Sequence, residues 1–248
     1  DAIPISYNKL IYTNLIIKLK KAKTNAGLAV EDRLNLLFPF DLNSSLRHRP
    51  KIYLTQNEKE EAQSKLKDFD INFTHPLYMI SVLGSDPTKS YPVTYMAKVL
   101  DHILKTADAQ LIFNYAPHQK DKALDVYNHC KKITQEHIYL DLTPSSLREF
   151  MAITYHCHAL IGNEGGAVNM AKAVGIPTFT IFSPWIDKKV WGSFEDGNKH
   201  VSVHLEDFKP EYYNQVIYKK LRTRSQELYK KFKPSFVIKK INSFLLSI

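Results

Sequence analysis

Short apolar runs alternate with helix-periodic segments from residue 77 to residue 182, and this alternation constrains the fold more than any other feature. The runs that predict strands are Tyr78–Leu83, Ala109–Tyr115, Ile138–Leu140, Ala159–Gly162 and Thr178–Phe182. The helical patterns between them cover Thr94–Thr106, His118–Lys132, a stretch opened by Thr143 and Pro144, and Ala167–Val174. Strands that are joined by helical crossovers run parallel, so the sequence predicts an α/β domain with a doubly wound, parallel, Rossmann-like sheet.

The regions on either side of this alternation lack strand patterns. Before it, helices are expected over Leu10–Lys23, Val30–Leu37 and Glu58–Lys67, and Arg49–Thr55 is expected to be extended. After it, helices are expected over Glu211–Leu221, Ser225–Phe232 and Ser235–Leu246. The sequence therefore divides into residues 1–48, an α/β domain over residues 49–208, and basic C-terminal helices over residues 209–248.

Positive charge is concentrated at the C-terminal end of the chain. The formal net charge of the whole sequence is +9. From Lys209 onward, ten Lys or Arg residues stand against two Glu, which gives this end +8 and leaves +1 for the rest. The sequence shows no zinc-finger spacing, no aromatic RNA-binding signature and no Arg-rich run in its body. We therefore expect no nucleic-acid partner.

Cysteine usage and hydropathy indicate a cytoplasmic protein. Cys130 and Cys157 are too few for a disulfide framework. No run approaches the roughly 20 apolar residues that cross a bilayer, and no secretory signal is visible. The chain begins with Asp1 rather than Met, so we expect an upstream part to be missing.

The segment NEGGAVNMAKAVGIP, residues 163–177, places two of the chain's 8 glycines between a predicted strand and a predicted helix. Ligands of doubly wound sheets bind at such carboxyl ends of strands. Gly165, Gly166 and Ala167 leave free N–H groups at the helix start, which favours a phosphate. Glu164 would repel a phosphate, so we expect it to accept hydrogen bonds from ligand hydroxyls or from the loop backbone. On composition alone, a tight turn with a solvated Glu164 explains the glycine pair equally well.

A second loop, VLGSDPTKSYP over Val82–Pro92, also follows a predicted strand and precedes a helix. Gly84 and Ser85 offer backbone and hydroxyl donors, and Lys89 offers a positive charge for a diphosphate. Alone, this segment would be interpreted as an ordinary loop with an exposed lysine. Two such loops on one sheet edge fit a diphosphate ligand better than either does separately.

Four separated motifs together resemble one family. The stretches SVLGS with K-SYP, NYAPHQKDKA, LTPSSLREFMA followed by HALIGNEGGAVNMAKAVGIPTFTIFSPW, and a trailing W-G are similar to the C-terminal domain of glycosyltransferase family 9, over Arg49–Gly192. This family includes the ADP-heptose:lipopolysaccharide heptosyltransferases. The resemblance implies the GT-B architecture, in which two Rossmann-like domains hold a nucleotide-sugar in their cleft and the C-terminal one makes most contacts. Residues 1–48 would then be a helical remnant of the N-terminal domain and the interdomain connection.

The resemblance also implies roles for individual residues. Glu164 and Gly166 match the family's acidic residue and glycine at the helix start, in the loop that holds the sugar and the diphosphate. Lys89 matches a lysine near the phosphates. The peptide Thr143–Ser146 lies where the family holds the base.

Three positions depart from the family pattern. Glu164 stands where the family usually has Asp, which adds a methylene to its reach. Asn169 stands where the family has a histidine beside the phosphates, and Gln119 stands where it often has a ribose-binding Glu. These changes leave the expected fold unaffected and bear on the identity of the donor, for which an ADP-linked sugar is the first expectation.

The predicted function is the inverting transfer of a heptose-like sugar from a nucleoside-diphosphate donor to a lipopolysaccharide-type, lipid-linked or other saccharide acceptor. Such transfer needs a general base for the acceptor hydroxyl and a preformed positive site for the departing diphosphate. The sequence supplies the second, but the family's candidate base is an Asp in the N-terminal domain, which is not found here. No catalytic residue is therefore nominated. No metal or other cofactor is expected, because helix N-termini and Lys89 can supply the positive field that a diphosphate needs.

Two other functions stay open at this stage. One is a non-catalytic nucleotide-sugar-binding module, which the absence of a recognisable N-terminal domain favours. The other is a nucleotide-sugar epimerase of the same architecture, which needs acid and base residues from both domains.

Two smaller features also have alternative interpretations. His156 and His158 flank Cys157 and could suggest a metal site, but no third ligand follows at a recognisable spacing, so hydrogen-bonded histidines are favoured. Trp185 and Trp191 could cover a sugar, although packing against the C-terminal helices is favoured.

The last predicted helix carries an apolar stripe opposite Lys239 and Lys240. The stripe could lie on the anionic inner face of the cell membrane, or it could pack on the other GT-B domain. We favour packing for the apolar side chains and a weak, peripheral membrane attraction for the charges.

Overall fold

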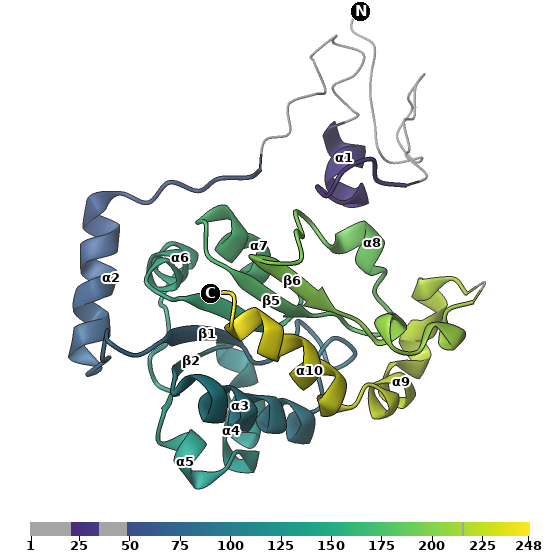
Figure 1. Ribbon diagram of the computed structural model, residues 1–248. Helices are drawn as coiled ribbons and strands as arrows, with labels where there is room; N and C mark the ends of the chain where they lie inside the picture. The colour runs from purple at the N-terminus through teal and green to yellow at the C-terminus, as the bar shows by residue number, and fades with distance from the viewer. Residues whose placement is uncertain (1–20, 35–48, 215) are drawn as a thin grey trace, which may run out of the picture.

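The computed structural model describes residues 21–34, 49–214 and 216–248, and it is built around one parallel sheet (Figure 1). Its six strands follow the spatial order β3-β2-β1-β4-β5-β6, and every neighbouring pair is parallel. The strands are β1 Leu77–Ser81, β2 Gln110–Asn114, β3 Ile138–Tyr139, β4 Ala159–Asn163, β5 Thr178–Ile181 and β6 His200–Val203. The predicted doubly wound α/β fold is confirmed.

The strand β6 was missed, because the sequence predicts only five strands. Its four residues, His200–Val203, are half polar, and the two central ones are only partly buried. β6 lies at the edge of the sheet and pairs with β5 alone. An edge strand needs no continuous apolar run, so hydropathy gave no signal for it.

Alternating side chains of the central strand divide the core into two layers. Tyr78 and Ile80 of β1 belong to one apolar cluster, and Leu77 and Met79 belong to the other. The first cluster includes apolar residues of α3 (Val93–Ala107) and α10 (Pro234–Leu245), and the second includes residues of α2 (Gln56–Asp68), α6 (Leu147–Tyr155) and α7 (Gly166–Ala173). Both faces of the sheet are therefore covered, as a parallel sheet requires.

The predicted helix His118–Lys132 is interrupted in the structure. It consists of a short 3₁₀ turn, η2 (Pro117–Gln119), then α4 (Lys120–His129) and a further turn, α5 (Lys132–Gln135). α4 ends because Cys130 adopts an extended backbone with ψ of 154°. Its thiol is buried, and Val126 and Ala123 of the same helix face the same core.

The N-terminal predictions are only partly covered by the described residues. The helix expected over Leu10–Lys23 lies mostly outside them, and Lys21–Lys23 are not helical. The helix expected over Val30–Leu37 is described as α1, Leu28–Leu34, and its end lies outside. The assignment of residues 1–48 to a remnant of another domain, and the boundaries at residues 49 and 209, stay predictions.

The C-terminal end contains two of its three predicted helices, α9 (Ser225–Lys231) and α10. A single helix over Glu211–Leu221 was wrong, because the structure has two 3₁₀ segments there, η4 (Pro210–Tyr212) and η5 (Tyr218–Arg224). Tertiary contacts override the helical pattern: Tyr213 is buried and donates its hydroxyl to the carbonyl of Pro184, whereas Val216 and Ile217 are exposed.

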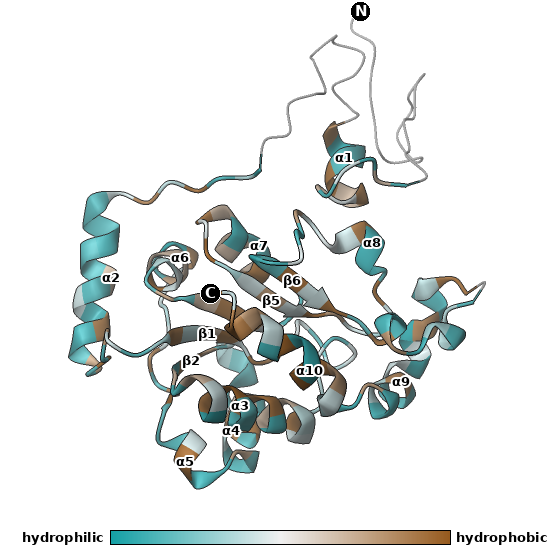
Figure 2. Cartoon of the chain, in the orientation of Figure 1, coloured by the Kyte–Doolittle hydropathy of each residue, from teal (hydrophilic) through white to brown (hydrophobic). Residues whose placement is uncertain are grey.

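The apolar stripe of α10 packs inside this domain. Val237, Ile241, Phe244 and Leu245 are buried, and the helix contacts α3, β5 and β6 (Figure 2). This corrects both earlier alternatives, since the stripe faces neither a membrane nor a second domain. Lys239 and Lys240 stay exposed on the other side. Among the described residues, no helix is long and apolar enough to span a bilayer.

Candidate functional site

Two loops meet where the adjacent strands β1 and β4 end. We call Val82–Pro92 the lysine loop and Glu164–Ala167 the glycine loop. Asn163, the last residue of β4, is fully buried and joins them. Its amide nitrogen donates to the carbonyls of Ser81 at 3.0 Å and Val82 at 2.9 Å, and its oxygen accepts from the N–H of Tyr91 at 2.7 Å. Asn163 was not among the residues predicted for the site, and only its place at the end of an apolar run could have signalled it.

Glycine is required at one position in each loop. Gly165 precedes α7 with φ of 153°, a conformation that strains other residues, and no atom lies within 4 Å of the place where a Cβ would be. A Cβ on Gly84 would lie 2.4 Å from the carbonyl oxygen of Lys89. The first glycine therefore leaves open space in front of the helix start, and the second lets the lysine loop close on itself.

The start of α7 offers unpaired donors to that open space. Gly165 has no side chain with which to cap the helix, so the first N–H groups, at Gly166 and Ala167, have no partner within the helix. The positive end of the helix dipole adds to their field. This arrangement suits an anion with oxygen acceptors.

Glu164 carries an unpaired acceptor at the same point. Its side chain is only 10% exposed, and its Oε1 makes no hydrogen bond to any described residue. The nearest cation is Lys89, whose Nζ lies 3.8 Å from Oε1. Burial raises the pKa of Glu164, and the Lys89 ammonium only partly opposes this. A buried carboxylate oxygen without a donor is costly, so this atom is prepared for a donor that a ligand brings.

One cavity, which we call the tryptophan cavity, opens beside Glu164 and Lys89. It has a volume of about 360 Å³. Trp185 and Trp191 form part of its wall, together with the glycine loop and Asn169. The Trp185 indole donates to the carbonyl of Thr88 at 2.9 Å, and Lys89 lies over its ring at 5.6 Å.

The favoured packing of the two tryptophans was therefore incomplete. Trp185 does contact the C-terminal segment, because the guanidinium of Arg222 lies 5.2 Å from its ring centre. It also lines the tryptophan cavity, and Trp191 lines the same cavity with 53% of its surface exposed. Trp185 therefore both packs against the C-terminal segment and forms part of the cavity wall.

A second cavity, which we call the serine cavity, adjoins the first through the glycine loop. Its volume is about 440 Å³, and it is lined by loops that follow β1, β2, β3 and β4. These loops bring together Gly84, Ser85, Gln119, the peptide Pro144–Ser146 and the glycine loop. Leu147 lies at its edge with 68% of its surface exposed. Glu164, Gly165 and Gly166 line both cavities.

All nine residues predicted for the site line one of these two cavities. The structure thus brings them together: the serine cavity holds Gly84, Ser85, Gln119, Glu164, Gly165, Gly166 and Ala167, and the tryptophan cavity adds Lys89 and Asn169. Their binding roles stay predictions.

Two of these nine side chains are already hydrogen-bonded within the protein. Gln119 donates from Nε2 to the carbonyl of Gly84 at 2.8 Å and accepts at Oε1 from the N–H of Ala116 at 3.0 Å. It holds two walls of the serine cavity together. Asn169 accepts at Oδ1 from the hydroxyl of Ser193 at 3.1 Å.

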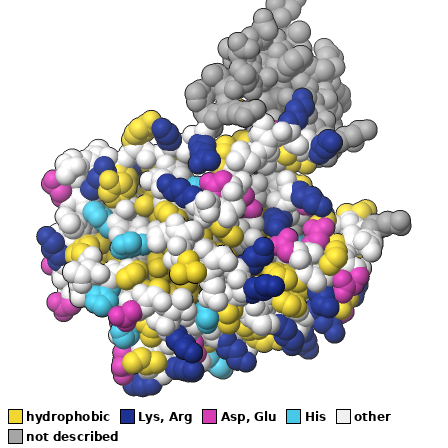
Figure 3. Space-filling model, in the orientation of Figure 1, with side chains coloured by type: hydrophobic (Ala, Val, Ile, Leu, Met, Phe, Trp, Pro, Cys, Tyr) yellow, Lys and Arg dark blue, Asp and Glu magenta, His cyan; other side chains and the backbone are white. Residues whose placement is uncertain are grey.

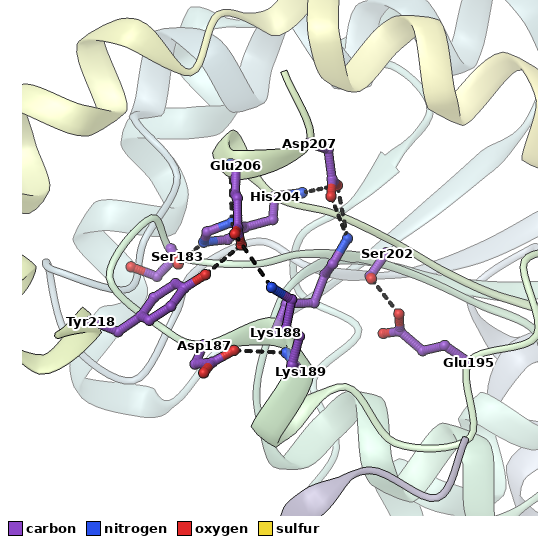
Figure 4. Close-up of polar contacts among 10 residues, drawn as sticks. All are labelled: Ser183, Asp187, Lys188, Lys189, Glu195, Ser202, His204, Glu206, Asp207 and Tyr218. Atoms are coloured by element: carbon purple, nitrogen blue, oxygen red, sulfur yellow. Dashed lines mark hydrogen bonds and ion pairs between the residues drawn. The ribbon is translucent and has the colours of Figure 1, made fainter. Parts of the chain in front are cut away.

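The loop after β5 is held by a polar cluster around His204 (Figure 4). His204 is fully buried and accepts at Nδ1 from the N–H of Glu206, so its Nε2 carries the proton and donates to the carbonyl of Ser183 at 3.1 Å. Burial lowers the pKa of His204 to about 4, which keeps the ring neutral. The cluster fixes Ser183, two residues before Trp185.

The same cluster also fixes the short helix α8 (Lys188–Trp191), which ends at Trp191. Lys188 donates to both carboxylate oxygens of Asp207, at 2.6 and 2.9 Å, and Lys189 lies 3.5 Å from Glu206. Glu206 also accepts from the hydroxyl of Tyr218. This cluster therefore positions both tryptophans.

The His156-Cys157-His158 segment is tied into the fold. His158 accepts at Nδ1 from the N–H of Leu77, and the Nε2 of His156 is hydrogen-bonded to the carbonyl of Lys59. Burial raises the pKa of the Cys157 thiol, which is the opposite of what a nucleophile needs. Within the described part of the chain, no three His, Cys, Asp or Glu side chains are gathered in a way that could hold a metal ion.

The comparisons with known proteins agree on one family and fold. The model of glycosyltransferase family 9 (heptosyltransferase) matches residues 6–221. A glycosyltransferase family 9 structure from Veillonella parvula superposes with a TM-score of 0.74 at 16% identity, covering 96% of this chain and 64% of that one. The E. coli ADP-heptose lps heptosyltransferase II superposes with a TM-score of 0.62 at 14% identity, covering 91% of this chain and 64% of that one.

The chain spans 64% of the length of both solved relatives. No curated protein matches the sequence. At such low identities the two structures show a shared fold, that of the GT-B glycosyltransferases.

Proposed function

The chain belongs to glycosyltransferase family 9, and from this premise we propose that its two adjoining cavities bind a nucleoside-diphosphate sugar and that it transfers the sugar to a saccharide acceptor. The observation that carries the proposal is the glycine loop. It places the free N–H groups of α7, the Lys89 ammonium and the unpaired oxygen of Glu164 where the two cavities join.

The proposal assigns one part of the donor to each region. The diphosphate binds the N–H groups of Gly166 and Ala167 and the ammonium of Lys89. The nucleoside occupies the serine cavity, where Pro144–Ser146 form one wall. The sugar occupies the tryptophan cavity, where Glu164 accepts from a sugar hydroxyl and the indole rings offer flat apolar walls.

This arrangement supports an inverting displacement. The acceptor oxygen attacks the anomeric carbon, the bond from that carbon to the phosphate oxygen breaks, and the nucleoside diphosphate leaves with the bonding electrons. Lys89 and the start of α7 stabilise the charge that develops on the departing diphosphate. The proton of the acceptor hydroxyl passes to a general base, and we assign that base to none of the described residues.

The proposed transferred sugar is a heptose, and the proposed donor is its ADP-linked form. The solved E. coli relative is named as an ADP-heptose lps heptosyltransferase, and the description of the family model names heptosyltransferase. We extend this to a lipopolysaccharide-type or lipid-linked acceptor in the cytoplasm. Because Glu164, Asn169 and Gln119 differ from the family pattern, a donor with a different sugar or base is the alternative.

Peripheral contact with the inner face of the membrane is part of this proposal. On the face drawn in Figure 3, Lys and Arg side chains gather at the lower right, in the region of α9. Lys230 and Lys231 of α9 and Lys239 and Lys240 of α10 are exposed. Because the apolar side of α10 is buried, the attraction would be electrostatic and would weaken as salt is added.

A non-catalytic binding module is the second candidate. The observation in its favour is that the chain spans 64% of the solved relatives. No contact among the described residues favours an epimerase over either of these.

A ligand panel with variants tests the proposal. ADP, UDP, GDP and CDP, each with its sugar conjugates, are added to the native chain, to Lys89→Ala and to Glu164→Ala, and thermal unfolding is followed. A ligand at 100 times its Kd stabilises the fold by about 2.7 kcal/mol. We expect one nucleoside diphosphate to do so, Lys89→Ala to weaken it, and Glu164→Ala to weaken only the sugar conjugate.

Transfer itself is then measured with the ligand that the panel identifies. Release of the nucleoside diphosphate in the presence of a saccharide acceptor supports a transferase. Binding without release supports the non-catalytic module. If no nucleotide stabilises the native chain, the donor-site proposal is wrong.

A further inference from the structure

The peptide Thr143–Ser146 contributes Pro144, Ser145 and Ser146 to the wall of the serine cavity. Ser145 and Ser146 line the serine cavity on one side. On the other side the same two residues line a separate cavity of about 360 Å³ between α2 and α6. The buried Leu142 anchors the chain just before this peptide, but Thr143, Ser145 and Ser146 are themselves exposed, so hydrogen bonds rather than their own burial hold them.

Two charged side chains provide those hydrogen bonds. Lys65 of α2 donates to the carbonyl of Thr143 at 3.1 Å and to Oε1 of Glu149 at 2.7 Å. Glu149 of α6 accepts at Oε2 from the N–H of Ser145 at 2.5 Å and from its hydroxyl at 2.6 Å. Thr143 and Ser145 are thereby tied to one ion pair, while Ser146 is the N-cap of α6 and accepts at its hydroxyl from the N–H of Glu149 at 3.1 Å.

The ion pair is sheltered but not deeply buried. The side chains of Lys65 and Glu149 are 28% and 25% exposed. Burial alone would raise the pKa of Glu149, but the hydrogen bonds from Lys65 and Ser145 lower it. Glu149 is therefore ionised at neutral pH, and its bonds to the peptide are charge-assisted.

We propose that Lys65 and Glu149 are positioning residues for the nucleoside, because they hold Thr143–Ser146 at the distance that the base and ribose need. This inference rests on the proposed function. Neither side chain lines the serine cavity. They act through the peptide, which presents Pro144 and Ser145 to a flat base beside the exposed Leu147 of α6.

The chain offers a matched control for this ion pair. Arg148 of α6 donates to Glu58 of α2 at 2.5 and 2.6 Å, so it also joins these two helices. Its side chain also donates to the carbonyl of Tyr53, and within the described part of the chain it makes no hydrogen bond to Thr143–Ser146. Arg148→Met therefore removes an α2–α6 ion pair without releasing the wall.

The test compares a nucleotide with its phosphates alone. The affinities of inorganic pyrophosphate and of the nucleoside diphosphate that binds the native chain most tightly are measured calorimetrically for the native chain, Lys65→Met and Arg148→Met. Loss of a charge-assisted hydrogen bond predicts that Lys65→Met raises the nucleotide Kd about tenfold. The Kd of pyrophosphate should change less than about twofold, because pyrophosphate does not touch the wall.

Two further variants guard against a merely structural effect. Lys65→Arg keeps the charge and the donors, so it should bind the nucleotide nearly as the native chain does. Glu149→Gln keeps the shape but weakens both bonds to Ser145, so it should show the same difference between nucleotide and pyrophosphate as Lys65→Met. It serves as the second variant if Lys65→Met does not fold.

The possible outcomes separate this inference from the proposed function. A native nucleotide Kd in Lys65→Met, or an equal loss for nucleotide and pyrophosphate, overturns the positioning role while leaving the donor site intact. The positioning role is also overturned if Arg148→Met raises the nucleotide Kd as much as Lys65→Met does. If no nucleoside diphosphate binds the native chain, the proposed function fails and the positioning role fails with it.

Discussion

The two ends of the proposed donor site are held by different kinds of contact. At the diphosphate end, the buried amide of Asn163 joins the lysine loop to β1 and to the glycine loop. At the nucleoside wall, the peptide Thr143–Ser146 is tied to an ion pair that is about one quarter exposed. Buried amide bonds do not titrate and are little affected by salt, whereas a partly exposed ion pair responds to both.

This difference indicates which parts of the proposed donor site are held in place by the fold itself. The diphosphate end lies between the two central strands, where every backbone group must be satisfied. The nucleoside wall follows β3, a two-residue strand at the edge of the sheet. Position in the sheet, rather than the chemistry of the ligand, decides how firmly each end is held.

The largest expected effect comes from removing the amide at the diphosphate end. Asn163→Ala leaves the N–H of Tyr91 and the carbonyls of Ser81 and Val82 without their partner. We expect a loss of at least about 3 kcal/mol in the free energy of unfolding, because each buried unpaired group costs about 1–3 kcal/mol. Urea denaturation measures this.

Asn169→Ala is the control for that variant. Asn169 is exposed and accepts one hydrogen bond, from Ser193. Its loss should change the free energy of unfolding by less than about 0.5 kcal/mol. Equal losses for the two asparagines would show that the diphosphate end is not fixed through Asn163.

A smaller effect is expected from the glycine pair, whose members differ only in backbone conformation. Gly165 has φ of 153°, whereas no positive φ occurs at Gly166, the first residue of α7. Gly165→Ala should therefore cost about 1–2 kcal/mol of unfolding free energy. Gly166→Ala should be neutral or slightly stabilising, since alanine favours the helix. Thermal unfolding of the two variants measures this difference. A Gly166→Ala variant less stable than Gly165→Ala would contradict the expectation.

The smallest effect is a difference in pH dependence between the two ends. The pKa of Glu164 is raised above 4.5, so its carboxylate weakens the native state as the pH rises from 4.5 through the raised pKa. The pKa of Glu149 is lowered below 4.5, so its contribution is complete above 4.5 and is lost as the pH falls through the lowered pKa.

The stabilities of Glu164→Gln and Glu149→Gln, each taken relative to the native chain, should therefore change in opposite directions as the pH rises. Glu164→Gln should gain stability relative to the native chain as the pH rises above 4.5. Glu149→Gln should be less stable than the native chain above pH 4.5, and this deficit should shrink at lower pH. Chemical denaturation between pH 3 and 8, taken as differences from the native chain, measures both. Parallel curves would remove the contrast between the two ends.

Much of the site could be predicted because it depends on order along the chain. Five of the six strands were visible as apolar runs, and parallel strands bring their carboxyl ends to one edge. The lysine loop and the glycine loop therefore appeared as neighbours before any contact was known, and Gln119 was added by the family resemblance. The edge strand β6 was invisible for the opposite reason, since half of its residues are polar.

What could not be predicted are contacts between segments distant in sequence. Lys65 and Glu149 are 84 residues apart, and neither matches a motif. Asn163 resembles any polar residue at the end of a strand until its three buried partners are seen. Trp185 and Trp191 appeared as packing residues, because sequence gives no sign of a cavity between a helix start and the loop after β5.

The most direct test of the donor site is a crystal structure of the chain with the nucleoside diphosphate that binds it most tightly. We expect the diphosphate to accept hydrogen bonds from the N–H groups of Gly166 and Ala167 and from Lys89, with the base in the serine cavity against Pro144–Leu147. A nucleotide bound elsewhere, or one whose phosphates point away from the start of α7, would contradict the assignment of this loop as the donor site.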